Sequence, residues 1–194
     1  MSRPREFDYE QVLHAATDVF REHGYHASSY ELLMKGTSLK KQSLYGAFGD
    51  KKSLFEKSIS FYCSNFLTRF EKMMSLNSSG LDALRCMQKN LLKTDPEELD
   101  VGCLIVNSTL EVTSPEFSFV KENFDNMFHG IKVILNQVIL AGQEEGTITK
   151  KIPSEQLAFN MANSIIGIRV MIRANMPKDQ IQAVLDAAIE TIVI

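Results

Sequence analysis

The chain has 194 residues, of which 44% are hydrophobic and 23% charged, and its formal net charge is −3. This composition is ordinary for a globular protein of one or two compact units. The longest nearly apolar run, residues 164–172, is too short to span a bilayer and contains Arg169. The first ten residues lack an apolar signal region, so we expect a cytoplasmic protein with no membrane partner. The three cysteines show no CxxC spacing, so we expect neither a disulfide framework nor a zinc site, and no cofactor.

The positive charge of the chain is concentrated near its N-terminus. Residues 1–57 contain nine Lys or Arg residues and eight Asp or Glu residues. Within them, residues 35–52 contain five lysines and one acid, Asp50, which is a local charge of +4. This local excess, rather than the net charge, indicates a polyanionic partner.

Apolar residues recur at helical spacing through most of the chain, and no alternating apolar and polar run is bounded by hairpin turns. Asp8, Ser28 and Asp50 are expected to cap the first, second and fourth helices. The predicted helices cover residues 8–24, 28–36, 41–48, 50–75, 81–93, 103–112, 116–145, 155–174 and 178–193. The predicted fold class is all-α, with a three-helix helix-turn-helix domain at residues 1–57 and a helical bundle at residues 58–194.

The segment at residues 41–48 has the pattern of a DNA recognition helix. Leu44 and Phe48 lie one turn apart and are expected to face inward. Lys41, Gln42 and Tyr45 must then face outward. Lys and Gln side chains can bind the edges of guanine and adenine, and Tyr can bind phosphate oxygens. The spacing therefore predicts a helix that enters the major groove of double-stranded DNA.

Lys51 and Lys52 begin the fourth helix, where the helix dipole disfavours cations. A bound phosphate would remove this conflict, because the free backbone amides and the lysines would bind the same anion. The alternative is a pair of solvated surface lysines. The helix-turn-helix spacing and the N-terminal Arg3 and Arg5 favour the phosphate.

Residues 20–29 (FREHGYHASS) and 43–55 (SLYGAFGDKKSLF) closely resemble the DNA-binding domain of the tetracycline-repressor (TetR) family. The resemblance covers about residues 8–57 and continues more weakly through GCLIVN at 102–107 and GIRV at 167–170. Ser38 departs from the family pattern, which often has Gly in this turn. By this resemblance, the residues expected to face DNA are Ser29, Lys40, Lys41, Gln42, Ser43, Tyr45 and Lys51.

The resemblance also implies a cavity for a small-molecule inducer within the second domain. Aromatic and methionine side chains at helical spacing are more often core than cavity lining, so this expectation rests on the resemblance. Cys103, Asn107 and Glu111 share one helix face and are the polar candidates, although a partly exposed polar edge is the alternative. Cys103 follows Gly102 at an expected helix N-terminus, which favours thiolate chemistry and raises the hypothesis of a thiol sensor. The expected cavity residues are Tyr62, Phe66, Met87, Cys103, Asn107, Glu111 and Phe128.

The last two helices carry apolar stripes, and the resemblance implies a homodimer in which two helices of each subunit form the interface. The alternative is that both stripes close the core of the single subunit. The expected interface residues are Ile165, Ile168, Ile172, Ile181, Leu185, Ala188 and Ile192.

The sequence therefore predicts a homodimeric DNA-binding regulator, most simply a repressor released from its operator by a small molecule or by thiol modification. The effector would shift the fourth helix, which belongs to both domains, and this shift would change the separation of the two recognition helices and weaken DNA binding. Two alternatives remain: a helical ligand-binding protein that does not act on DNA, and a hydrolase using Cys103 and His129. No nucleophile elbow, phosphate loop or HExxH helix supports an enzyme.

Overall fold

A computed structural model of the chain describes residues 7–91 and 101–194. Arg3, Arg5 and the end of the helix expected at 81–93 lie outside these residues. The described residues form nine α-helices, one short 3-10 helix and no strand, apart from an isolated bridge between Ile148 and Val193. The elements are α1 (Tyr9–Ala27), α2 (Tyr30–Thr37), α3 (Lys41–Phe48), α4 (Lys51–Ser75), α5 (Gly80–Leu91), α7 (Leu104–Glu111), η1 (Pro115–Phe117), α8 (Ser118–Glu144), α9 (Ser154–Arg173) and α10 (Lys178–Glu190). The all-α prediction is confirmed.

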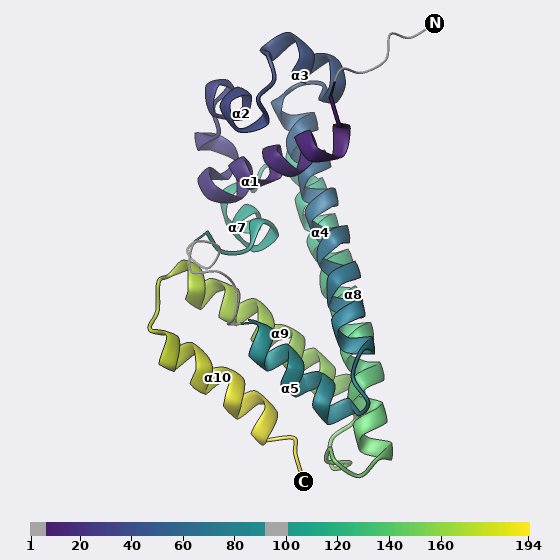
Figure 1. The fold of residues 1–194 in the computed structure, drawn as a ribbon. Helices are drawn as coiled ribbons and strands as arrows, with labels where there is room; N and C mark the ends of the chain where they lie inside the picture. Colours follow the sequence, from purple (N-terminus) through teal and green to yellow (C-terminus); the bar gives the residue numbers. More distant parts are fainter. Residues whose placement is uncertain (1–6, 92–100) are drawn as a thin grey trace, which may run out of the picture.

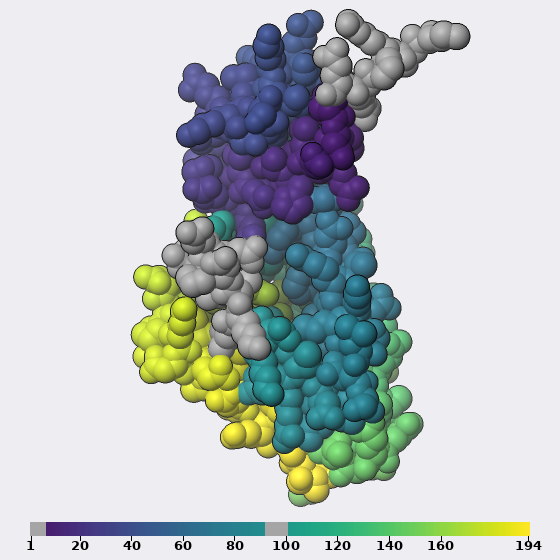
Figure 2. All heavy atoms as spheres, in the orientation of Figure 1, coloured from purple at the N-terminus to yellow at the C-terminus, as the bar shows by residue number. Residues whose placement is uncertain are grey.

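Two long helices, α4 and α8, lie side by side along the molecule (Figure 1). Their 25 and 27 residues correspond to about 38 and 40 Å at the usual helical rise. Helices α1 to α3 pack at one end, and α5, α9 and α10 pack beside the other (Figure 1). The space-filling view shows the N-terminal helices as a cap on an elongated molecule (Figure 2). The expected domain division after residue 57 falls inside α4, so one unbroken helix belongs to both parts.

The caps of the helices follow the sequence with one shift. Asp8 Oδ1 accepts hydrogen bonds from the amides of Glu10 and Gln11, and Asp50 Oδ1 accepts one from Ser53. Ser29, rather than Ser28, caps α2. Ser28 is fully buried, and its hydroxyl donates back to the Gly24 carbonyl, so it is not free to cap.

Two helix boundaries also differ from the prediction. Gly24 has a φ of 76° and kinks α1, but a further turn continues to Ala27. The helix expected at 116–145 begins instead at Ser118, because the residues after Pro115 first form a 3-10 turn.

Buried side chains hold α2 and α3 against α1 and α4. Leu33, Leu44 and Phe48 are almost completely buried, together with Phe20 of α1 and Phe55 of α4.

No helix of the described residues is long and apolar enough to cross a membrane.

Candidate functional site

One face of α3 is open to solvent because its opposite face is buried. Leu44 and Phe48 point into the core. Lys41, Gln42 and Ser43 are exposed in the first turn, and Tyr45 is half-buried. The outward direction of this set agrees with the sequence analysis. The helix therefore offers a cation, an amide, a hydroxyl and a phenol from its N-terminal half.

Lys41 and Tyr45 form a small cluster with Tyr30 of α2. The Lys41 Nζ atom lies 5.0 Å from the centre of the Tyr30 ring and 5.7 Å from that of Tyr45, and the two rings are 5.0 Å apart. Desolvation, followed by a hydrogen bond with Tyr30, raises the pKa of Tyr45 to about 12. Tyr45 therefore remains a neutral hydrogen-bond donor at pH 7, and the cation–π contacts orient Lys41 beside it.

The turn before α3 contains a residue in an unusual backbone conformation. Ser38 has a φ of 56° and a ψ of 20°, which is the left-handed region that glycine adopts most easily. Lys40 follows in an extended conformation at the N-cap of α3 and is exposed. Ser29 is also exposed, but its Oγ atom accepts the amide of Leu32 at 3.2 Å.

Both lysines of the second pair have partners within the chain. The Lys51 Nζ atom donates to the His26 carbonyl at 3.3 Å and lies 4.6 Å from the centre of the Tyr25 ring. Burial lowers the pKa of Lys51. Lys52 lies 3.7 Å from a carboxylate oxygen of Glu116. These contacts, together with the Asp50 cap, already offset the conflict with the helix dipole, so α4 does not require an external anion for this purpose.

Glu111 connects α7 with the end of α1 and is not among the residues that line the cavity described below. It is the last residue of α7, and its two carboxylate oxygens accept the backbone amides of Tyr25 at 2.9 Å and His26 at 2.7 Å. These amides are free because Gly24 interrupts α1. A Cβ atom added at Gly24 would lie 2.6 Å from the Glu111 Oε2 atom. We call this contact between Glu111 and residues 24–26 the interdomain latch.

The N-terminal end of α7 is also held by hydrogen bonds. The Gly102 carbonyl accepts a hydrogen bond from Arg21 Nε of α1 at 3.1 Å. The Cys103 Sγ atom is 3.4 Å from the Tyr62 hydroxyl, which donates to it, and Asn107 Nδ2 donates to the Val101 carbonyl at 3.2 Å. The residues at the start of α7 therefore contact both α4, through Tyr62, and α1, through Arg21.

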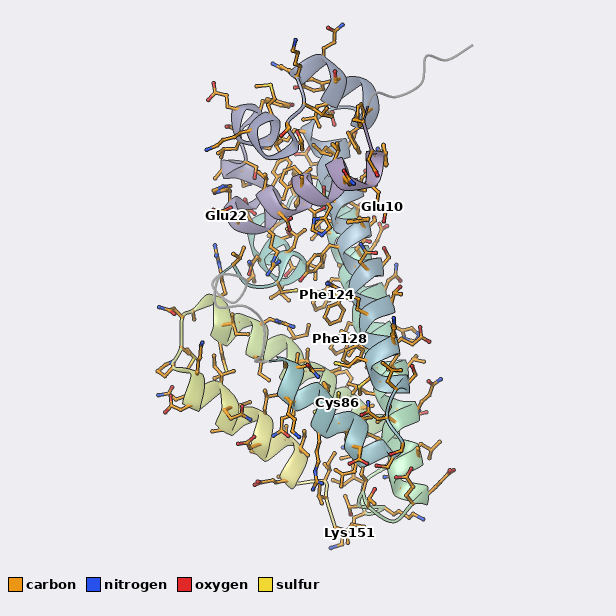
Figure 3. All side chains as sticks on the ribbon, viewed as in Figure 1. Glu10, Glu22, Cys86, Phe124, Phe128 and Lys151 are labelled. Atoms are coloured by element: carbon orange, nitrogen blue, oxygen red, sulfur yellow. The ribbon has the colours of Figure 1, made fainter. Side chains whose placement is uncertain are left out.

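A cavity of about 660 Å³ lies between α1, α4, α5, α9 and residues 101–102. Tyr62 and Phe66 line it, as expected, whereas Met87, Cys103, Asn107, Glu111 and Phe128 do not. Met87 is fully buried in the core and Cys103 lies behind Tyr62. Phe128 stacks with Phe124 one turn earlier on α8 (Figure 3) and packs edge-on against Phe159 of α9.

The sequence analysis missed the polar side chains of this cavity. Arg21, Arg69 and Arg169 line it, together with His14 and Asp18. Arg169 carried the one available signal, because it interrupts the apolar run at residues 164–172.

The residues predicted to form the dimer interface do not lie on the surface of the subunit, so this prediction is wrong. Six of them are buried inside the single subunit, and Ala188 is half-buried. The alternative reading, in which both stripes close the core of the subunit, is the correct one, because α9 packs on α8 and α10 packs on α9. The exposed apolar side chains of these helices are instead Phe159, Val170 and Val184, which are 50%, 45% and 39% exposed.

The arrangement gives no support to a Cys–His hydrolase. Cys103 is buried with Tyr62 as its partner, whereas His129 is exposed on α8. Among residues 7–91 and 101–194, no group of three His, Cys, Asp or Glu side chains is placed to hold a metal ion.

Comparison with known proteins agrees with the helix-turn-helix geometry. Residues 12–57 match the model of the bacterial regulatory proteins of the tetR family. An uncharacterized HTH-type transcriptional regulator of Bacillus subtilis, YezE, is 30% identical over 154 residues, which cover 74% of this chain and 78% of the relative. The HTH-type transcriptional repressor ComR of Escherichia coli is 24% identical over 176 residues, covering 88% and 82% of the two chains.

Solved structures share the fold over nearly the whole chain. A cysteine-substituted form of the TetR family regulator CifR, complexed with a 26-base-pair operator, has a TM-score of 0.82 at 23% identity and covers 98% of this chain and 100% of its own. The match at 30% identity over most of both sequences shows the family itself. The chain is therefore a DNA-binding transcriptional regulator and belongs to the TetR family.

Proposed function

We propose that the protein is a homodimeric repressor that occupies an operator through α3 of each subunit and leaves it when a small molecule fills the cavity. The observation that carries this proposal is the exposed face of α3, where Lys41, Gln42 and Tyr45 stand on a buried base of Leu44 and Phe48. Ser29, Lys40 and Ser43 are exposed as well, and we propose that they contact the same DNA.

Lys51 is assigned a different role from the other six. Its ammonium group reaches phosphate only by leaving the His26 carbonyl and the Tyr25 ring. We infer that Lys51 contributes to the bound state through exchange of partners, and that its net contribution to affinity is smaller than that of Lys41.

The dimer proposal moves to the outer faces of α9 and α10. Phe159, Gly167 and Val170 share one face of α9 at helical spacing. Nothing lies within 4 Å of a Cβ atom built at Gly167, so this face has room for a second copy of the chain to approach closely. Val184 supplies the exposed apolar side chain of α10. Two recognition helices are needed because a single module makes few contacts with one half-site.

Helix α7 offers a route from the cavity to the DNA-binding end. A ligand that presses on Val101 or Gly102 in the cavity wall displaces the start of α7, and the interdomain latch at Glu111 transmits this to the end of α1. The unbroken α4 would move with it. The coupling requires two arrangements of these helices, of which DNA favours one and the ligand the other.

A reversible ligand is favoured over thiol modification as the releasing signal. Cys103 is buried and accepts the Tyr62 hydroxyl, so a reagent must first open this packing. The cavity beside it is already formed.

The experiment that tests the proposal is a salt series of DNA binding with the fragment upstream of the protein's own gene. Wild type is compared with Lys41→Ala and with the control Lys89→Ala, which removes an exposed lysine on α5. We expect Lys41→Ala to weaken binding by about 1–3 kcal/mol and to reduce the salt slope by about one. Lys89→Ala should match wild type. Absence of saturable binding, or a Lys41→Ala curve that overlays wild type, would refute the proposal.

A further inference from the structure

The cavity is lined both by arginine side chains and by aromatic and apolar side chains of α4, and this combination indicates the chemistry of its ligand. Tyr62, Arg21 and Arg169 all line the cavity, and the two positive charges act on the Tyr62 hydroxyl. Further along α4, Phe66 and Phe70 stack with their ring centres 5.7 Å apart, and Met73 follows on the next turn. The distance along the helix from Tyr62 to Met73 is about 16 Å.

Two of the three arginines of the cavity lack an acidic partner among the described residues. In residues 7–91 and 101–194, no carboxylate lies within ion-pair distance of Arg69 or Arg169. Arg169 is half-buried and comes from the apolar helix α9. Withdrawing a guanidinium from water without an anion is unfavourable, so an anionic ligand would stabilise this site.

The two carboxylates that line the cavity do not cancel this charge. Asp18 lies 3.0 Å from His14 Nδ1, and Glu22 lies 3.6 Å from His23 Nε2. Their side chains are 55% and 64% exposed to solvent, and Glu22 lies toward the opposite end of α1 from Glu10 (Figure 3). Water therefore screens the charges of Asp18 and Glu22. The charge of Arg169 is screened less, because this side chain is half-buried.

We propose that the cavity binds an amphipathic carboxylate, an organic acid whose carboxylate pairs with Arg169 and whose hydrocarbon body lies along Phe66, Phe70 and Met73. A guanidinium presents a planar pair of donors that matches a carboxylate. The side chains of α4 that line the cavity extend over about 16 Å of the helix, a length that suits an aryl-alkyl or medium-chain acyl body. The assignment of this ligand as the effector rests on the function proposed above.

The probe for this inference is octanoate, which carries the carboxylate on a short acyl chain. Octanol and octylamine have the same chain with a neutral or a positive head group. Binding of each to the purified full-length protein is measured by isothermal titration calorimetry without DNA. We expect octanoate to bind at least about tenfold more tightly than octanol, and octylamine to bind more weakly than both.

Variants at Arg169 distinguish a site that binds the carboxylate from one that binds only the acyl chain through apolar contacts. Arg169→Met should reduce octanoate affinity about tenfold or more and leave octanol affinity unchanged, while Arg169→Lys should keep part of the preference. The matched control is Arg85→Met on α5, which removes an exposed arginine outside the cavity and should change neither affinity. Urea unfolding of each variant establishes that it is folded before it is compared.

The outcomes separate this inference from the proposed function. Equal binding of the three probes, no binding of octanoate, or a preference that survives in Arg169→Met would overturn the carboxylate assignment, even if the operator complex forms normally. Octanoate binding that depends on Arg169 supports the assignment. If the same protein then fails to bind operator DNA, the repressor proposal fails and the ligand class stands.

Discussion

Replacing Glu111 tests the interdomain latch most directly. Glu111→Ala removes the acceptor of two backbone amides, those of Tyr25 and His26, which lie 2.9 and 2.7 Å from the carboxylate. A hydrogen bond to a charged group contributes about 1.5–3 kcal/mol when it is well protected. His26 is exposed, so water can partly replace the lost acceptor. We therefore expect the free energy of unfolding to fall by about 2 kcal/mol in total. Glu111→Gln retains one acceptor oxygen and should lose about half as much.

The assay is urea unfolding followed by circular dichroism at one fixed protein concentration, because a dimer makes stability depend on concentration. Glu122→Ala, which removes an exposed acid on α8, is the control and should change stability by less than about 0.5 kcal/mol. The same variants are then tested for release of operator DNA by ligand. If Glu111→Ala is as stable as the control and responds to ligand as wild type does, the latch neither holds the domains together nor transmits the signal.

Four further outcomes are expected. Ser38→Gly should raise the free energy of unfolding by up to about 1 kcal/mol, because glycine adopts the φ of 56° without strain; an equal or lower urea midpoint would contradict this. Gly167→Glu should produce a folded monomer in analytical ultracentrifugation, since a Cβ atom at this position meets nothing within 4 Å inside the subunit; a stable dimer would show that the interface lies elsewhere. A difference titration of tyrosine absorbance between wild type and Tyr45→Phe should have its midpoint near pH 12. The folded state holds this proton more tightly than the unfolded state, so stability should decline as pH rises from the ordinary value of 10.0 toward 12. A thiol reagent at neutral pH should modify Cys86 first, because Cys63 and Cys103 are buried and burial raises the pKa of Cys63 to about 12; a fast reaction that persists in Cys86→Ser would revive the thiol-sensor hypothesis.

The N-terminal domain was predictable because its signals are local. The caps at Asp8 and Asp50 and the inward spacing of Leu44 and Phe48 are each decided within a few residues, and the structure has them as expected. The contacts of Lys51 were not predictable, because the Tyr25 ring and the His26 carbonyl reach it only through the packing of α1 against α4.

In the C-terminal domain, the helices could be predicted from the sequence, but which neighbour packs against each face of a helix could not. An apolar stripe such as Ile165, Ile168 and Ile172 must be buried, yet the sequence does not say whether a second subunit or the same chain buries it. Here the same chain does so, because α8 and α10 flank α9. Glu111 shares a helix face with Cys103, but its position one residue before the end of the predicted helix leaves it free to bind another domain. Spacing along one helix carries no information about which neighbour approaches it.

The Gly24–Glu111 contact turns two distant positions into one constraint on the sequence. A Cβ atom at Gly24 would lie 2.6 Å from the carboxylate and would push it away from the two amides, and the φ of 76° favours glycine as well. The kink at the glycine frees two amides, and the acid accepts both of them. The dependence is therefore one-sided: relatives that lack the acid still need glycine for this backbone conformation and must leave the two amides to water or to another acceptor, whereas the acid has no such pair of amides to bind where the glycine is absent.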